Sequence, residues 1–134
     1  MAIAILNMKS NQSLDGAAQS IFRTLGISEY RRHDSDNTPG GIYFKAKADE
    51  LTLKLYPADD ADFEYRYTLS LKAPNGSSVN LEGFVDKIVE KLLRAGYDIC
   101  RELEGPERLT ACQGYSLTSA GGLVKRIEKL SRAN

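Results

Sequence analysis

The chain has 134 residues, of which 42% are hydrophobic and 27% are charged, and its eighteen basic and eighteen acidic side chains cancel to zero formal net charge. A chain of this length buries enough surface to fold as a single domain, 1–134, without disulfides or a metal. Zero net charge excludes a global field that would draw the molecule to nucleic acid or anionic lipid, so any such attraction must come from a local patch.

Targeting and redox signals are weak in this sequence. The opening stretch AIAIL is too short to cross a bilayer, and it lacks the basic flank and small-residue cleavage site of a signal peptide. We therefore expect a cytoplasmic protein without a membrane partner. Two cysteines and a single histidine match neither a zinc site nor a disulfide framework, so we expect no structural metal.

The N-terminal region predicts an extended segment followed by a helix. Residues 1–8 are almost continuously apolar, which indicates a buried strand or an extended arm laid against the core. Apolar side chains then recur every three or four residues from Leu14 to Leu25, as on one face of a helix. Ser13 is placed to cap this helix and Gly26 to end it.

A sheet region follows the first helix. Apolar and polar residues alternate over 41–72, which predicts three antiparallel strands, the third of them beginning at Tyr65. The first two strands are joined by a tight hairpin at 48–50, and the acidic segment 57–64 makes a longer loop. Residues 27–32 are a candidate for a further strand before these three.

A second helix is predicted after Asn80, which can cap its first turn. Val79 can pack on Phe84 as a hydrophobic staple, and Gly96 can take the left-handed conformation that ends the helix. One face of this helix is apolar, and its residues are Leu81, Phe84, Val85, Ile88, Val89 and Leu92.

The C-terminal region predicts strands over 98–103 and 109–117 and a final helix from Ser119. Gly121 and Gly122 in the first turn of that helix each cost about 1 kcal/mol relative to alanine, so we expect a weak N-terminal end. The element order is then (β)αβββ(β)αββα. This is an α+β fold, a single antiparallel sheet with helices packed on one face.

The two C-terminal strands also predict where the cysteines lie. Pairing Leu103 with Leu109 puts both on the core face of one hairpin, and the same register sets Cys100 directly opposite Cys112. We expect two neighbouring, buried thiols that act as small apolar groups.

The single histidine, His33, is followed by Asp34 and Ser35, which suggests a catalytic triad. Adjacent residues cannot form a chain of nucleophile, base and orienting acid, and the sequence has no nucleophile elbow, phosphate loop or dinucleotide fingerprint. We therefore predict no catalytic residue and no cofactor, with His33 exposed in a loop or at a strand edge.

The acidic segment allows three interpretations. A calcium loop, a solvated loop and a protein-binding patch all use several carboxylates on a short bend, although the spacing of a calcium-binding loop is absent. A second polar loop could add to a protein-binding patch. The carboxylates concerned are Asp59, Asp60, Asp62 and Glu64 in the acidic segment and Asp34 and Asp36 in the other loop.

The outward face of the predicted sheet is basic and carries aromatic rings, a combination typical of single-stranded nucleic-acid binding. It is equally the ordinary composition of exposed strands, in which lysine discourages aggregation, and it would also suit an acidic protein partner. The residues are Tyr43, Lys45, Lys47, Thr52, Lys54, Tyr56, Arg66, Thr68, Ser70 and Lys72.

The stretch EYRRHDSDNTPGGIYF, residues 29–44, resembles a run found in small bacterial immunity-type proteins of polymorphic and contact-dependent toxin systems. An acidic bend followed by an aromatic strand is a further similarity. The matching positions are Glu29, Arg31 or Arg32, Ser35, Asn37, Gly40 or Gly41, Tyr43 and Phe44, with the bend at Asp59 and Asp60. The resemblance implies a non-enzymatic protein that binds and blocks a cognate toxin domain, and it carries over no contact residue.

The leading hypothesis is therefore a toxin-neutralising binding protein, and a basic nuclease is the toxin that the acidic side chains would attract. Aromatic anchors for the partner would be Tyr30, Phe63 and Tyr65. The predicted partner-binding residues are Tyr30, Asp34, Asp36, Asp59, Asp60, Asp62, Phe63 and Glu64. The alternative is a nucleic-acid or anion-binding module that uses Lys45, Lys54, Arg66 and Lys72. A small-molecule enzyme with a pocket between sheet and helices is the third hypothesis.

Overall fold

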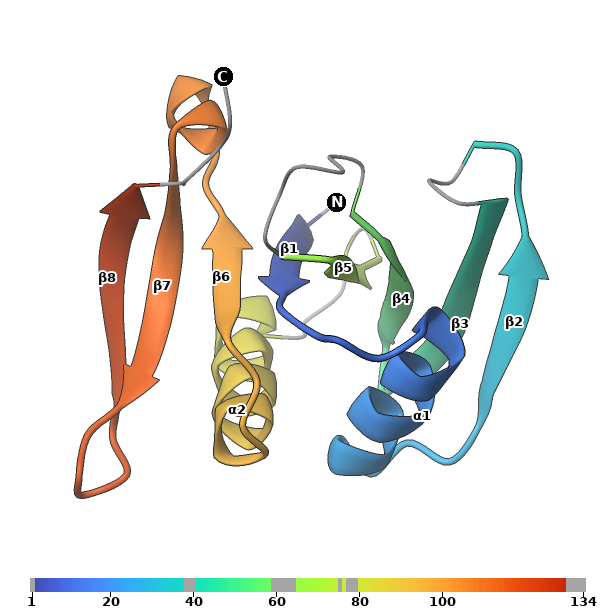
Figure 1. Ribbon diagram of the computed structural model, residues 1–134, viewed down its shortest axis with the longest axis horizontal. Helices are drawn as coiled ribbons and strands as arrows, with labels where there is room; N and C mark the ends of the chain where they lie inside the picture. Colours follow the sequence, from blue (N-terminus) through green and yellow to red (C-terminus); the bar gives the residue numbers. More distant parts are fainter. Residues whose placement is uncertain (1, 38–40, 59–64, 75, 77–79, 130–134) are drawn as a thin grey trace.

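The computed structural model describes residues 2–37, 41–58, 65–74, 76 and 80–129, which form two helices and one antiparallel sheet, an α+β fold (Figure 1). The fold class expected from the sequence is therefore confirmed. The elements are β1 (Ala2–Met8), α1 (Leu14–Thr24), β2 (Tyr30–Asp34), β3 (Ile42–Ala48), β4 (Leu51–Pro57), β5 (Tyr67–Ala73), α2 (Leu81–Arg94), β6 (Ile99–Glu102), a 3-10 helix (Pro106–Leu109), β7 (Ala111–Leu117) and β8 (Leu123–Lys129).

The sheet has the strand order β2-β3-β4-β5-β1-β6-β7-β8, and each neighbouring pair is antiparallel. In Figure 1 this order runs from β2 at the right to β8 at the left. The N-terminal segment is a central strand, β1, between β5 and β6. Strand β1 lies between two groups of strands, each of which is consecutive in the sequence. Strands β2 to β5 form one end of the sheet, and strands β6 to β8 form the other.

The core lies between the helices and one face of the sheet. Alternate residues of β1, β4 and β5 reach this face, where they form one buried cluster with residues of both helices. Helix α1 adds four fully buried side chains, Ala17, Ala18, Ile21 and Phe22. The strand layer consists mainly of Leu6, Leu51, Leu53, Leu55, Leu69 and Leu71, all of them fully buried.

Both helices begin and end as their sequences predict. The Ser13 and Asn80 side chains each accept a hydrogen bond of 3.2 Å from the backbone N–H three residues later. Gly26 and Gly96, beyond the C-terminal ends, have φ of 75° and 96°, the left-handed region that glycine enters at little cost. The proposed staple involves Val79, which lies outside the described residues.

The predicted final helix is wrong, because residues 123–129 form strand β8. All seven of its residues pair with β7, from Leu117 opposite Leu123 to Ala111 opposite Lys129. Apolar residues four apart fit a strand face as well as a helix face, so the spacing did not distinguish the two. The predicted cap Ser119 lies instead in the β7–β8 turn, where Gly121 has a φ of 87°.

The predicted register of the cysteine hairpin is also wrong. Cys100 lies opposite Gly114, and Cys112 lies opposite Glu102, two positions from the expected pairing. The connection between β6 and β7 contains a 3-10 helix that ends at Leu109. Leu109 therefore belongs to this connection and not to the paired part of the hairpin. The two thiols form no disulfide and remain buried neighbours in one cluster, on the sheet face that carries no helix.

Tyr65 does not belong to the third predicted strand. It precedes β5 and is buried against Cys100 and Cys112, whereas Tyr67 points to the helix side and donates a 2.5 Å hydrogen bond to the Gln12 carbonyl. The alternation therefore breaks between the two tyrosines. As a result, the Tyr65 ring packs within the protein.

Candidate binding face

The sheet face without helices is basic over β2 to β5. The pairing of these strands brings their lysines and one arginine to the same side, in agreement with the alternation of the sequence. Among the residues of these four strands, the one carboxylate is Asp34, which pairs with Ile42 toward the opposite face. The cationic side chains, called here the basic face, are Arg31, Lys45, Lys47, Lys54 and Lys72.

A row of three side chains, one each from β2, β3 and β4, lies on the basic face. The rings of His33 and Tyr43, which are cross-strand partners, stack with their centroids 5.1 Å apart and their planes at 9°. Lys54 Nζ lies 5.2 Å from the Tyr43 centroid. Because β3 lies between β2 and β4, these neighbours approach Tyr43 from opposite sides. Stacking and cation–π attraction hold the row in place and occupy both faces of the Tyr43 ring.

On β5, nearer the centre of the sheet, two polar side chains of the same face are buried. Thr68 and Ser70, predicted to point outward, are buried, and the Thr68 hydroxyl donates a 2.7 Å hydrogen bond to Asn7 Oδ1. Burial, together with the negative charge of Glu102, raises the pKa of Tyr56, and a hydrogen bond with Ser70 opposes this rise. The accessible cations of the face are therefore those over β2 to β4 and Lys72 on β5.

Three of the residues predicted to bind a partner, Tyr30, Asp34 and Asp36, lie in the described structure. Tyr30 is half-buried on the helix side, with its ring centroid 4.8 Å from that of Phe22 and 5.9 Å from that of Phe44, so it fastens β2 to the core. Asp34 ends β2 and Asp36 lies in the turn after it, both exposed. The remaining predicted residues, Asp59, Asp60, Asp62, Phe63 and Glu64, lie outside the described residues.

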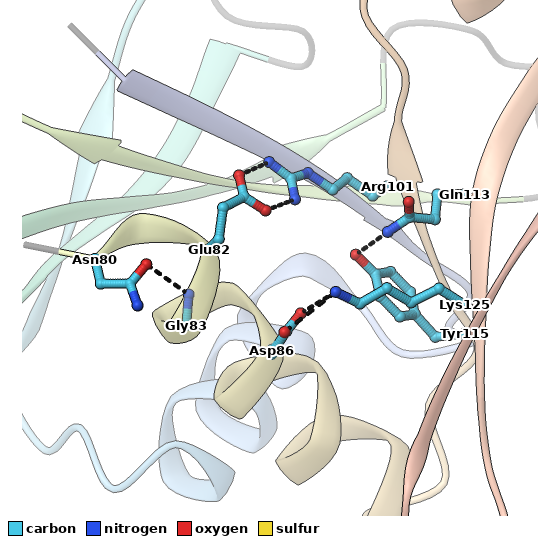
Figure 2. Close-up of polar contacts among 8 residues, drawn as sticks. All are labelled: Asn80, Glu82, Gly83, Asp86, Arg101, Gln113, Tyr115 and Lys125. Carbon is cyan, nitrogen blue, oxygen red and sulfur yellow. Dashed lines mark hydrogen bonds and ion pairs between the residues drawn. The ribbon is translucent and has the colours of Figure 1, made fainter.

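A polar cluster that the sequence analysis missed joins α2 to β6, β7 and β8 (Figure 2). Arg101 donates two hydrogen bonds to the Glu82 carboxylate, at 2.6 and 2.8 Å. Lys125 Nζ lies 3.0 Å from Asp86 Oδ1, an ion pair without hydrogen-bond geometry, and donates a 3.1 Å hydrogen bond to Oδ2. Glu82 and Asp86 stand one helical turn apart, which is the sequence signal that could have indicated a shared acidic side of α2.

The pKa shifts in this cluster follow from its pairing. The hydrogen bonds from Arg101 lower the pKa of Glu82 and raise that of the guanidinium itself. Burial raises the pKa of Tyr115, whose hydroxyl accepts a 2.9 Å hydrogen bond from Gln113 Nε2. Each charge has an opposite partner within the cluster, so its clearest role is to hold α2 against the sheet.

The third hypothesis requires a pocket between sheet and helices. A groove of about 530 Å³ lies between the α1–β2 connection, the β3–β4 hairpin and α2. Its described lining includes three lysines and two carboxylates but no histidine or cysteine, which are common general bases and thiol nucleophiles. Its charged lining residues are Glu29, Lys47, Asp49, Lys87 and Lys91.

Comparison of the chain with models of known protein families and with curated proteins finds no match. Within the described ranges, no three His, Cys, Asp or Glu side chains are grouped so that they could hold a metal ion. Neither described helix has the length and apolar character needed to cross a membrane. The candidate site therefore depends on the geometry of the basic face alone.

Proposed function

We propose that this chain is a non-enzymatic binding protein that docks the acidic surface of a protein partner through the basic face. The observation that carries the proposal is the segregation of charge. Five cations gather on the helix-free side of β2 to β5 without a carboxylate from those strands, although the chain as a whole is neutral. Such a patch raises the rate of encounter with an oppositely charged surface and selects against basic ones.

The row across this face favours a protein over single-stranded nucleic acid. Sequence-tolerant binding of single strands uses aromatic rings on which bases stack. The Tyr43 ring is already flanked by His33 on one side and by Lys54 on the other, so a base would have to displace one of them. A partner carboxylate needs no free ring face, because it can pair with the lysine ammonium groups directly.

The resemblance of residues 29–44 to immunity-type proteins supplies the class of partner, a toxin domain that the chain would cover and neutralise. The basic face favours a toxin with an acidic docking surface. The hypothesis that the toxin is a basic nuclease depends on the acidic residues Asp59, Asp60, Asp62 and Glu64, which lie outside the described residues.

The test is to co-express and co-purify the chain with the product of the adjacent gene. We expect a complex and loss of the partner's toxicity. Reversing the charge of the basic face in Lys45→Glu/Lys54→Glu should weaken binding at least tenfold, whereas Lys87→Glu/Lys91→Glu on α2 should leave it unchanged. No complex with full toxicity, or equal binding by both double variants, would rule out the proposal.

A second measurement tests the alternative hypothesis that the basic face binds nucleic acid. A labelled single-stranded oligonucleotide is titrated with the protein at low and at physiological salt, since phosphate contacts make affinity fall steeply with ionic strength. We expect no saturable binding at physiological salt. Tight, strongly salt-dependent binding that is lost in Lys45→Glu/Lys54→Glu would replace the protein partner with nucleic acid.

A further inference from the structure

The two edge strands of the sheet differ in what they expose. On the outer side of β8, no strand among the described residues pairs with the backbone. Three large hydrophobic side chains are exposed in the described chain, and two of them lie on β8, Val124 at 39% and Ile127 at 64%. Edge strands of this kind pair readily with another strand unless something blocks them. The other edge, β2, exposes the charged residues Arg31, Arg32 and Asp34.

We propose that two copies of the chain associate through β8, antiparallel, with the two-fold axis at Ile127. In this register each Ile127 side chain faces that of the second copy, so the most exposed apolar group of the strand becomes covered. Arg126 then lies opposite Glu128 of the second copy, and the reverse pair forms on the other side of the axis. Self-complementarity of this kind is what a two-fold interface requires.

Other registers of the same pairing are less favourable. In an antiparallel pair, residues directly opposite each other point to the same sheet face. Two identical strands related by a two-fold axis can therefore pair only in registers in which one residue, the centre, lies opposite the same residue of the second copy. Arg126, Glu128 and Lys129 as centres would place like charges in contact, which destabilises a strand pair. Lys125 as the centre would place Arg126 opposite Val124 and Glu128 beyond the start of the second β8, so neither charge would gain an opposite partner. Leu123 or Val124 as the centre would pair only the start of the strand and leave Ile127 exposed.

In the single chain, the Arg126 and Glu128 side chains already point to the sheet face on which they would pair in the dimer. Arg126 Nε contacts Glu128 Oε1 at 2.5 Å, and its Nη1 donates a 2.9 Å hydrogen bond to Ser116, so both charged groups stand on the helix-free side. On the helix side, Lys125 would lie opposite Lys129 of the second copy. This contact is tolerable because Lys125 is neutralised by Asp86 of its own chain.

Pairing about this axis extends the sheet across both copies. Because opposite residues share a face, the helices of the two copies lie on one side and the two basic faces on the other. The edge pairing therefore leaves the basic face of each copy free. It is independent of the proposed function, since the two surfaces share no residue.

The decisive experiment is a charge swap read by sedimentation equilibrium over a concentration series. We expect wild-type dimers, and monomers for Arg126→Glu and for Glu128→Arg, because each single change places like charges opposite each other. The double variant Arg126→Glu/Glu128→Arg should restore the dimer. Circular dichroism checks that every variant is folded. Monomeric wild-type protein, or a folded double variant that stays monomeric, would overturn the proposal.

Cross-linking tests the register itself. Ile127→Cys places a thiol next to that of the second copy, and mild oxidation should give a disulfide-linked dimer on a non-reducing gel. Lys129→Cys is the matched control, since the same axis separates its two thiols by roughly 13 Å along the strand direction. Both variants keep the buried Cys100 and Cys112. Equal cross-linking at the two positions, or none at Ile127→Cys, would contradict the register.

Discussion

The two ends of the sheet are attached to the helices by different chemistry. Over β3 to β5 the attachment is apolar, with leucines such as Leu53 and Leu71 fully buried on the helix side. Over β6 to β8 the corresponding positions include Arg101, Gln113 and Lys125, which reach α2 or one another through charged and polar contacts (Figure 2). The helix layer thus covers an apolar region of the sheet over β3 to β5 and a polar region over β6 to β8.

This difference separates stability from specificity. Burial of leucine is non-directional and contributes stability in proportion to the area removed from water. Hydrogen-bonded pairs such as Glu82 with Arg101 contribute little net energy when they are partly exposed, but they are formed in one geometry only. We infer that the apolar end supplies most of the folding free energy, and that the polar cluster fixes how α2 lies on β6 to β8.

The largest expected effect is at the apolar end. Leu53→Ala removes a fully buried side chain between Ala46 and Leu71 and should lower the free energy of unfolding by about 2–5 kcal/mol, measured by urea denaturation. Thr52→Ala, on the opposite face of the same strand, is the control and should change it by less than about 1 kcal/mol. A loss at Leu53 no larger than that at Thr52 would refute the assignment of stability to this end.

A smaller effect is expected at the polar end. Arg101→Met keeps the length of the side chain but removes both hydrogen bonds to Glu82, and the exposed carboxylate returns to water, so the loss should be about 1 kcal/mol. The loss should shrink in high salt, where ion pairs are screened. Lys87→Met on the same helix serves as the control. A salt-independent loss as large as that of Leu53→Ala would show that the two ends do not differ.

The smallest effect is a pH dependence. Because Arg101 lowers the pKa of Glu82, the folded state favours the ionised carboxylate, and this contribution is present above the ordinary value of 4.5 and is lost as the pH falls through the lowered pKa. The stability difference between wild type and Glu82→Gln should therefore be visible at neutral pH and shrink as the pH falls below 4.5. A difference that persists unchanged at low pH would assign it to packing instead.

Features that depend on near neighbours in the chain were predicted correctly. Each helix cap joins residues three apart, Ser13 with Gly16 and Asn80 with Gly83, so the sequence contains both partners. The alternation over 41–72 likewise predicted that the four lysines of the basic face share one side, because the period of a strand is a local property. Arg66, expected on the same side, instead precedes β5 and donates a 3.4 Å hydrogen bond to the Ser10 carbonyl. The arrangement of His33 and Lys54 around Tyr43 was not predicted, since it requires three strands to be placed side by side.

The sequence by itself determined the α+β class, both helices with their ends, and the charge of the helix-free face. The tertiary structure alone decided that residues 123–129 are a strand, that Cys100 lies opposite Gly114, and that Glu82 meets Arg101. The physical reason is the range of the interactions. Backbone caps and side-chain periods act within a few residues, whereas the identity of an edge strand and the register of a hairpin depend on pairing with a segment that the local pattern does not specify.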